Sequence, residues 1–369
     1  MPFIRKSNKH SNPKERYTNL ELLRILAALF VVIVHYNNAG SGKAFLYTES
    51  MTLHHQILMM FEMLAICAVN IFVMISGYFL CTSTRVNLWK ILRLYIDVII
   101  FSVLRYFLYC LLGEEIFSLP NLLRRFIPLN WYVAVYCGLY LISPYLNQIL
   151  QSKSRSQFRF LLLVFFFVFS VWPSGVEFLS KAFDFSPNSL SPISNQGSLD
   201  GYTLINFILM YFLGSYCRIH GRTNPSPRKS LYALLAYFSC TVVNTLYANF
   251  FFGRAASYCN PLVVIQTVAI FIVFQNLTIQ SKAINTISSC AFGVYLMHSF
   301  FFPYCQIERF VTGNPILIPI HVLGSSLLIY TICALIYWPY NKVMSSLITS
   351  FQNKFGPLAY DMDGIYGKP

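Results

Sequence analysis

The stretch LELLRILAALFVVIVHY, from Leu20 to Tyr36, decides how this chain folds. It is long and apolar enough to cross a bilayer, yet it contains Glu21, Arg24 and His35. Ionisable groups inside a membrane span cost free energy, so they indicate function. At about 100° per residue, Arg24 and His35 leave the helix on one face, about 16 Å apart along its axis. Glu21 precedes Arg24 by one turn and shares that face.

The composition of the 369-residue chain is that of a polytopic membrane protein. The chain is 56% hydrophobic and 11% charged, whereas soluble domains have shares of about 45–50% and 25%. Its 34 Phe and 25 Tyr suit helix interfaces and the headgroup level of a bilayer. The net charge of +14 comes from basic residues spread over short segments between apolar runs. This distribution indicates membrane orientation, and we expect no nucleic-acid partner.

Apolar windows predict an all-α transmembrane bundle of about ten membrane-spanning helices. The windows are residues 20–37, 57–80, 91–112, 126–150, 160–179, 203–219, 231–252, 261–277, 288–306 and 317–338. With the N-terminus inside, nineteen Lys and Arg residues fall on inner segments and six on outer ones. This excess predicts that both termini are cytoplasmic. The expected division is a basic cytoplasmic tail over residues 1–19, a membrane domain over 20–340 and a cytoplasmic tail over 341–369.

The ten Cys residues sit mostly within apolar runs and form no CxxC or Cys/His cluster. We therefore expect neither a disulfide framework nor a metal site. The predicted topology places Cys259 and Cys305 near one membrane surface, which leaves a bond between that pair open. The first nineteen residues are polar and basic, so we expect residues 20–36 to remain as the first span rather than to be cleaved as a signal peptide.

Four further segments follow the first span in a recognisable order. They are NIFVMISGYFL (Asn70 to Leu80), NLWKILRLY (Asn87 to Tyr95), NWYVAVYCGLYLISP (Asn130 to Pro144) and AFGVYLMH (Ala291 to His298). Together with the first span they resemble the acyltransferase 3 family of integral-membrane acyltransferases, over nearly all of the chain. Lys90 stands where that family has the first Arg of an R-x-x-R stretch. The resemblance implies transfer of an acyl group, commonly acetyl or succinyl, from a coenzyme A thioester to sugar hydroxyls of cell-surface glycans.

His35 is the candidate general base for such a reaction. A sugar hydroxyl that attacks a thioester needs a base, and imidazole titrates at about pH 6.5. His35 lies about 22 Å along the first helix from its inner end, hence in the outer half of the bilayer. The alternative is a histidine that forms a hydrogen bond at the headgroup level.

Arg24 suits a phosphate or carboxylate. It either holds a phosphate of coenzyme A or only pairs with Glu21, which we expect to orient it.

Donor binding is also expected where the third span begins. Lys90, Arg93 and Asp97 share one helical face that enters the membrane from the cytoplasm. An anionic donor would meet this face first, and the family pattern favours Arg93. The alternative is a positive-inside anchor with an Arg93 and Asp97 pair.

Other candidate substrate-binding residues have structural alternatives. Asn70 and Ser76 end the second span beside a glycine, where we expect close helix packing rather than a serine nucleophile. Trp131 and Tyr132 suit either an interfacial belt or stacking on sugars.

Tyr295 and His298 share one face of a late span. His298 either contacts the acceptor or acyl group, or is a buried, hydrogen-bonded histidine. Glu62 and Arg105 are further intramembrane charges. A pair between them is geometrically open, and no role is assigned to either.

The predicted protein is thus a multi-pass O-acyltransferase of a bacterial inner membrane. Its expected partners are acyl-CoA as donor substrate, an exported or lipid-linked glycan as acceptor, and membrane lipids, with no permanently bound cofactor. A membrane transporter or lipid-linked glycan flippase is the alternative, and a receptor or structural membrane protein the third hypothesis. A transporter typically has broken helices in two related halves, and no internal repeat is seen.

Overall fold

The computed structural model describes residues 17–184, 199–221 and 225–361 of the chain, and these are almost entirely helical. The predicted N-terminal tail lies largely outside the described residues. The elements, in chain order, are α1 (Thr18–Asn37), η1 (Ala44–Tyr47), α2 (Leu53–Ala65), α3 (Ala68–Leu80), β1 (Arg85–Asn87), α4 (Leu88–Leu111), α5 (Leu119–Arg125), α6 (Trp131–Gln151), α7 (Arg155–Phe166), the π-helical turn η2 (Phe167–Val171), α8 (Trp172–Ala182), η3 (Leu199–Gly201), α10 (Leu204–His220), α11 (Pro227–Ala255), α12 (Pro261–Gln275), α13 (Lys282–Ser288), α14 (Ala291–Met297), η4 (His298–Phe300), η5 (Phe302–Tyr304), α15 (Ile307–Val311), α16 (Leu317–Phe355) and β2 (Ala359–Asp361).

Seven stretches of helix in the described chain are long and apolar enough to cross a membrane. They coincide with seven of the predicted windows, so the prediction of an all-α, multi-pass membrane fold is confirmed. The other three windows differ from the prediction. α10 has 17 residues and α12 has 15, and residues 288–306 form α14, η4 and η5 instead of one continuous helix. α14 ends at Met297, and the short 3₁₀ turns after it include Pro303, which has no backbone N–H to donate.

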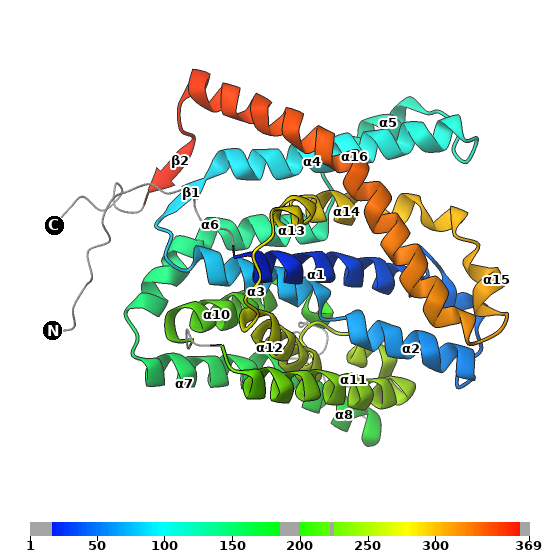
Figure 1. The fold of residues 1–369 in the computed structure, drawn as a ribbon, viewed down its shortest axis with the longest axis horizontal. Helices are drawn as coiled ribbons and strands as arrows, with labels where there is room; N and C mark the ends of the chain where they lie inside the picture. The colour runs from blue at the N-terminus through cyan, green and yellow to red at the C-terminus, as the bar shows by residue number, and fades with distance from the viewer. Residues whose placement is uncertain (1–16, 185–198, 222–224, 362–369) are drawn as a thin grey trace.

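The first span is the central helix of the bundle. α1 packs against α2, α3, α12, α13, α14 and α16, and in Figure 1 it runs through the middle of the fold. Leu23, Ala27 and Val32 are fully buried on it. Side chains on this helix are therefore surrounded by protein, as an intramembrane charge requires.

α3 and α10 cross in close contact. A Cβ atom at Gly77 would overlap the carbonyl oxygen of Tyr211, and one at Gly214 would overlap that of Met74. Ser215 Oγ donates a hydrogen bond to the Gly77 carbonyl over 3.2 Å. The expected close helix approach at Gly77 is confirmed.

The C-terminal segment is ordered well beyond the last predicted span. α16 continues for 39 residues to Phe355, and β2 pairs antiparallel with β1, so that Arg85 faces Asp361. The Leu88 amide also donates to the Leu358 carbonyl over 2.8 Å. The end of the chain is therefore attached to the start of α4.

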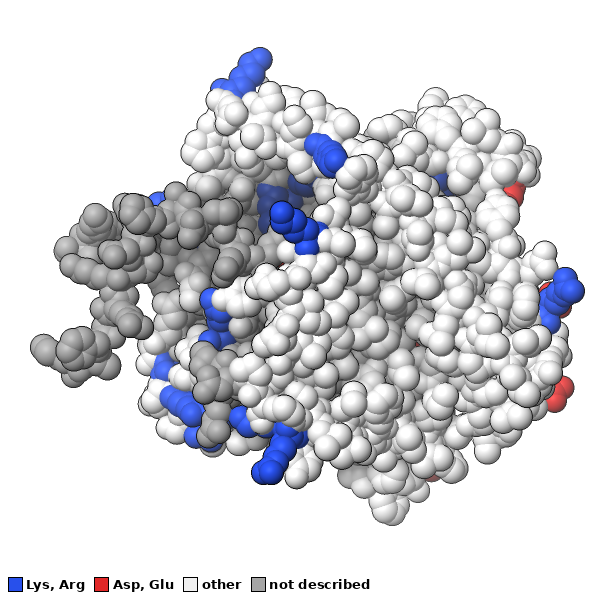
Figure 2. Space-filling view, in the orientation of Figure 1, with Lys and Arg blue, Asp and Glu red and all other residues white. Residues whose placement is uncertain are grey.

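Charged residues are distributed unevenly along the bundle. On the face shown in Figure 2, most Lys and Arg atoms lie toward the end where α1 begins and β1 pairs with β2, and most visible Asp and Glu atoms lie at the opposite end. All ten cysteines are free thiols, so the bond left open between Cys259 and Cys305 does not form.

Candidate active site

A cavity of about 280 Å³ opens between α1, α3, α4, α6 and residues 288–295. We call it the Lys90 cavity. It brings together five of the candidate residues, and its lining includes Arg24, Ser76, Lys90, Tyr132 and Tyr295.

Two cations face this cavity, and one carboxylate accompanies them. Arg24 forms an ion pair with Glu21, and its side chain keeps 29% of its surface exposed. Ser288 Oγ donates a hydrogen bond to the same Glu21 carboxylate over 2.6 Å. Lys90 Nζ donates to the Tyr136 hydroxyl over 3.0 Å and has no carboxylate partner in the described part of the chain. The surplus positive charge suits an anionic ligand.

Aromatic rings form one wall of the Lys90 cavity. The rings of Tyr132 and Tyr136 are stacked, with centroids 6.0 Å apart, and Tyr140 continues the row at 6.4 Å from Tyr136. Lys90 Nζ lies 4.4 Å from the centre of the Tyr140 ring. Sequence reasoning missed Tyr136 and Tyr140, although the i, i+4, i+8 spacing of the three tyrosines places them on one face of α6.

Asn130 fixes the start of this wall. Its side-chain oxygen accepts the Val133 amide over 3.0 Å and caps α6. The same oxygen accepts the Tyr295 hydroxyl over 2.9 Å. One side chain therefore positions both α6 and α14.

His35 and His298 form a pair beyond the end of the Lys90 cavity that Val31 lines. Their ring centres are 4.5 Å apart in an edge-on arrangement. Each Nδ1 lies close to a backbone carbonyl one turn earlier, at 2.9 Å for His35 with Val31 and 3.0 Å for His298 with Val294. A carbonyl only accepts hydrogen bonds, so in the neutral ring Nδ1 donates and Nε2 keeps its lone pair.

Neither Nε2 atom has a hydrogen-bond partner among the described residues. His298 is only 4% exposed. Val31, whose carbonyl accepts the His35 hydrogen bond, itself lines the Lys90 cavity. The cavity therefore ends within one helical turn of an imidazole that is free to accept a proton.

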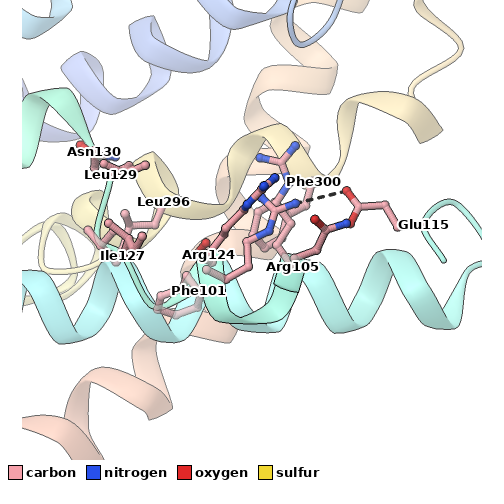
Figure 3. A pocket seen from close by; sticks show the side chains of 13 residues that line it. Phe101, Arg105, Glu115, Arg124, Ile127, Leu129, Asn130, Leu296 and Phe300 are labelled. Atoms are coloured by element: carbon pink, nitrogen blue, oxygen red, sulfur yellow. Dashed lines mark hydrogen bonds and ion pairs between the residues drawn. The ribbon is translucent and has the colours of Figure 1, made fainter. Parts of the chain in front are cut away.

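A second cavity, of about 500 Å³, lies toward the other end of α4. We call it the Arg105 cavity. Its lining includes Arg105, Arg124, Arg125, Asn130, Leu296 and Phe300 (Figure 3). Lys90 and Arg105 are fifteen residues apart, which separates their Cα atoms by about 22 Å along the helix.

The histidine pair is placed between the two cavities. Tyr295 lines the Lys90 cavity, whereas Leu296 and Phe300, on either side of His298, line the Arg105 cavity. The hydrogen bond between Asn130 and Tyr295 joins the two walls. Molecules bound in the two cavities could thus reach the same histidine pair from opposite directions.

The model of one protein family, described as an acyltransferase domain, matches residues 17–338. The chain belongs to the acyltransferase 3 family. The match includes both cavities and the histidine pair, and it confirms the resemblance carried by the five segments. Comparison with curated proteins and with solved structures finds no match to this chain.

In this member of the acyltransferase 3 family, Arg93 is held outside the Lys90 cavity. Its Nε lies 3.2 Å from Asp97, and its other nitrogens donate to Asn341 at 2.8 Å and Ser345 at 3.2 Å on α16. The anchoring pair with Asp97 is therefore present, and Lys90, which matches the family pattern less well, faces the cavity.

Two other predicted residues, Asn70 and Trp131, lie outside the lining of both cavities. Asn70 is fully buried, donates to the Tyr258 carbonyl over 2.8 Å and accepts from Asn206 over 3.1 Å. Trp131 lies against Tyr202, with ring centres 4.4 Å apart. Ser76 does line the Lys90 cavity, but its hydroxyl donates to its own helix at the Phe72 carbonyl over 2.9 Å.

The pair left open between Glu62 and Arg105 does not form. Glu62 accepts the side-chain amide of Asn37 over 2.9 Å. The Arg105 guanidinium lies over the rings of Tyr109 and Phe300, at 5.0 and 5.6 Å. Among the described residues, no group of three or more His, Cys, Asp or Glu side chains is arranged to hold a metal ion.

Proposed function

We propose that this chain is an integral-membrane O-acyltransferase that moves an acyl group, acetyl or succinyl, from cytoplasmic acyl-CoA to a hydroxyl of an exported or lipid-linked glycan. The observation that carries this proposal is the Lys90 cavity, which begins at two cations and ends one helical turn from His35. A phosphorylated thioester donor needs such positive charge, and transfer of its acyl group needs a nearby base.

The donor would enter with its phosphates on Lys90 and Arg24. Tyr132 and Tyr136 offer ring faces to the less polar parts of the coenzyme. The acyl thioester would then point along α1 toward Val31 and the histidine pair. In this assignment Lys90, rather than Arg93, binds the donor.

The chemistry is a direct transfer. His35 Nε2 removes the proton of the acceptor hydroxyl, whose oxygen attacks the thioester carbonyl. When the resulting tetrahedral intermediate collapses, the carbon–sulfur bond breaks and the coenzyme A thiolate takes the proton from the imidazolium. His298, edge-on to His35, would contact the acceptor or the acyl group. Ser76 forms no covalent intermediate in this scheme, because no base contacts its hydroxyl.

The orientation proposed for the bundle follows its charge distribution. The positive-inside rule assigns the end bearing β1 and β2 to the cytoplasm. The Lys90 cavity would then face the donor pool and the Arg105 cavity the outer side. We propose about ten membrane crossings, both termini cytoplasmic, and a bacterial inner membrane as the location.

The test is His35→Ala in cells that produce the protein, with the acyl content of the surface glycan followed by mass spectrometry at matched protein level. We expect acylation to fall by about 10²- to 10⁴-fold, the usual contribution of a general base. His54→Ala is the matched control, because His54 is a partly exposed histidine outside both cavities whose Nε2 lies 2.8 Å from the Gly313 carbonyl. Acylation retained in His35→Ala would exclude the proposed base.

A purified-protein assay separates the proposal from a flippase. Acceptor-dependent release of free coenzyme A from labelled acyl-CoA is expected of an enzyme. Movement of a lipid-linked glycan across vesicles, with no release of coenzyme A, would instead favour the transporter.

A further inference from the structure

Three arginines meet at the Arg105 cavity, and one carboxylate accompanies them. Arg105 comes from α4, and Arg124 and Arg125 from the last turn of α5. Arg125 pairs with Glu115 at 3.3 Å. In the described part of the chain neither Arg105 nor Arg124 has a carboxylate partner. The cavity therefore holds two uncompensated positive charges.

The position of α5 over α4 is fixed by a buried tyrosine. The Tyr106 hydroxyl accepts the Ser118 amide over 2.6 Å and donates to the Ser118 carbonyl over 3.0 Å. Ser118 is the residue before the first turn of α5. The Arg125 guanidinium lies 5.5 Å from the centre of the Tyr106 ring. Because α5 is attached in this way, its two arginines are held on the same cavity as Arg105, with Arg124 at the exposed side.

The apolar side chains in the wall of the cavity strengthen the repulsion between its arginines. Figure 3 shows Arg105 and Arg124 extending into the same space, beside the apolar side chains of Leu296 and Phe300. Like charges in a partly desolvated pocket repel one another, and an anion between them removes that repulsion. Guanidinium groups present paired donors that match a carboxylate or a phosphate.

We propose that the Arg105 cavity binds an anionic group, a carboxylate or a phosphate, carried by the acceptor glycan. This assignment rests on the proposed function and specifies its acceptor as an acidic or phosphorylated sugar. The volume of about 500 Å³ is in the range of small-ligand sites. Asn121 and Asn130 supply amide groups on its wall for sugar hydroxyls.

The place of the cavity supports an acceptor rather than the donor. Arg105 lies 5.6 Å from the ring centre of Phe300, two residues after His298. Asn130 contacts Tyr295 on the other side of the same histidine. An anion held at Arg105 places the adjoining sugar beside the histidine pair, whereas Lys90 and Arg24 lie beyond the pair on the opposite side. Donor and acceptor anions would thus be held by separate sets of cations.

The experiment measures binding to the full-length protein in phosphatidylcholine nanodiscs without donor. Three probes are compared: a glucuronate-containing oligosaccharide, its carboxyl-reduced form, and a neutral oligosaccharide with a terminal phosphate. We expect one or both anionic probes to bind at least ten-fold more tightly than the reduced form. The double variant Arg105→Gln with Arg124→Gln should lose that preference, and Arg309→Gln, an exposed arginine outside both cavities, should keep it.

Two measurements keep the test decisive. Thermal unfolding reports whether the double variant is folded, and Arg105→Lys, which keeps the charge but loses the paired donors, should bind with intermediate affinity. The carboxylate and phosphate arms identify the source of the anion. The proposal is overturned if all three probes bind equally or if the double variant keeps the preference. It is also overturned if phosphatidylglycerol in the nanodisc abolishes probe binding, since the site would then hold a lipid headgroup.

Failure of this inference is distinguishable from failure of the enzyme assignment. Release of coenzyme A with neutral and acidic acceptors alike would remove the anion site and leave the acyltransferase. Arginine-dependent binding of an anionic probe, with no release of coenzyme A on any acceptor, would keep the anion site and remove the acyltransferase.

Discussion

Two positive charges one turn apart on α4 have opposite surroundings. Arg93 is enclosed by Asp97, Asn341 and Ser345, and Asp97 accepts further hydrogen bonds from Tyr337 at 2.9 Å and Tyr340 at 2.6 Å. Lys90 faces a cavity, and its Nζ contacts Tyr136 and Tyr140. A cation inside a membrane helix therefore acts as a cross-link where protein groups surround it, and where they do not, as at Lys90, it is open to the donor that we propose.

The largest effect is expected on stability, when the cross-link between Arg93 and Asp97 is broken. Asp97→Ala removes a carboxylate that is 1% exposed and that accepts hydrogen bonds from Arg93 and from two tyrosine hydroxyls. Loss of one partner from such a pair costs about 3–5 kcal/mol. Thermal unfolding in detergent should show a large fall in stability, with a smaller fall for Asp97→Asn, which keeps one acceptor oxygen. An unchanged transition would mean that the cluster does not hold α4 to α16.

The second-largest effect is expected on donor binding, when Lys90 is replaced. Lys90→Gln should leave unfolding unchanged and raise the KM for acyl-CoA about ten-fold or more, since a hydrogen bond to a charged group contributes about 1.5–3 kcal/mol. Steady-state kinetics with varied donor give the result, and Lys342→Gln, on α16 and outside both cavities, is the control. A loss of stability as large as that of Asp97→Ala would place Lys90 among the cross-links.

The smallest effect concerns the support of Arg24. Ser288→Ala removes a hydrogen bond to the Glu21 carboxylate, which acts on the donor only through Arg24, so the KM for acyl-CoA should rise only a few-fold. Ser289→Ala is matched to it, because Ser289 lines the same cavity but bonds the Thr286 carbonyl of its own helix. Equal kinetics for the two variants would show that Glu21 positions Arg24 without help from Ser288.

The roles of Lys90 and Arg93 were beyond sequence reasoning for a physical reason. Their spacing places both on one helical face, which is correct, but the face is divided between a cavity and α16. The groups that enclose the Arg93 and Asp97 pair lie about 240 residues further along the chain. Only tertiary packing decides which of two neighbouring cations is enclosed.

Local patterns predicted more where the partners are close in sequence. The Glu21 and Arg24 pair follows from one helical turn and is present. The first span, the close approach at Gly77 and the family were also predicted. The prediction of one helix over 288–306 was wrong because hydropathy does not register where a helix ends, here at Met297. The contact between His35 and His298 joins distant segments, so neither histidine alone predicts it.

The pairing of β1 with β2 also bears on how the protein is made. Residue 85 is synthesised well before its partner at residue 361, because the two strands are separated by most of the helices of the bundle. Trp89, next to Lys90, likewise donates from its indole to the Gly356 carbonyl over 3.2 Å. The start of α4 can therefore gain these contacts only after the helices between the two strands have been synthesised. A chain cut before residue 356 would lack both β2 and the Gly356 carbonyl, and the start of α4 would lose these contacts.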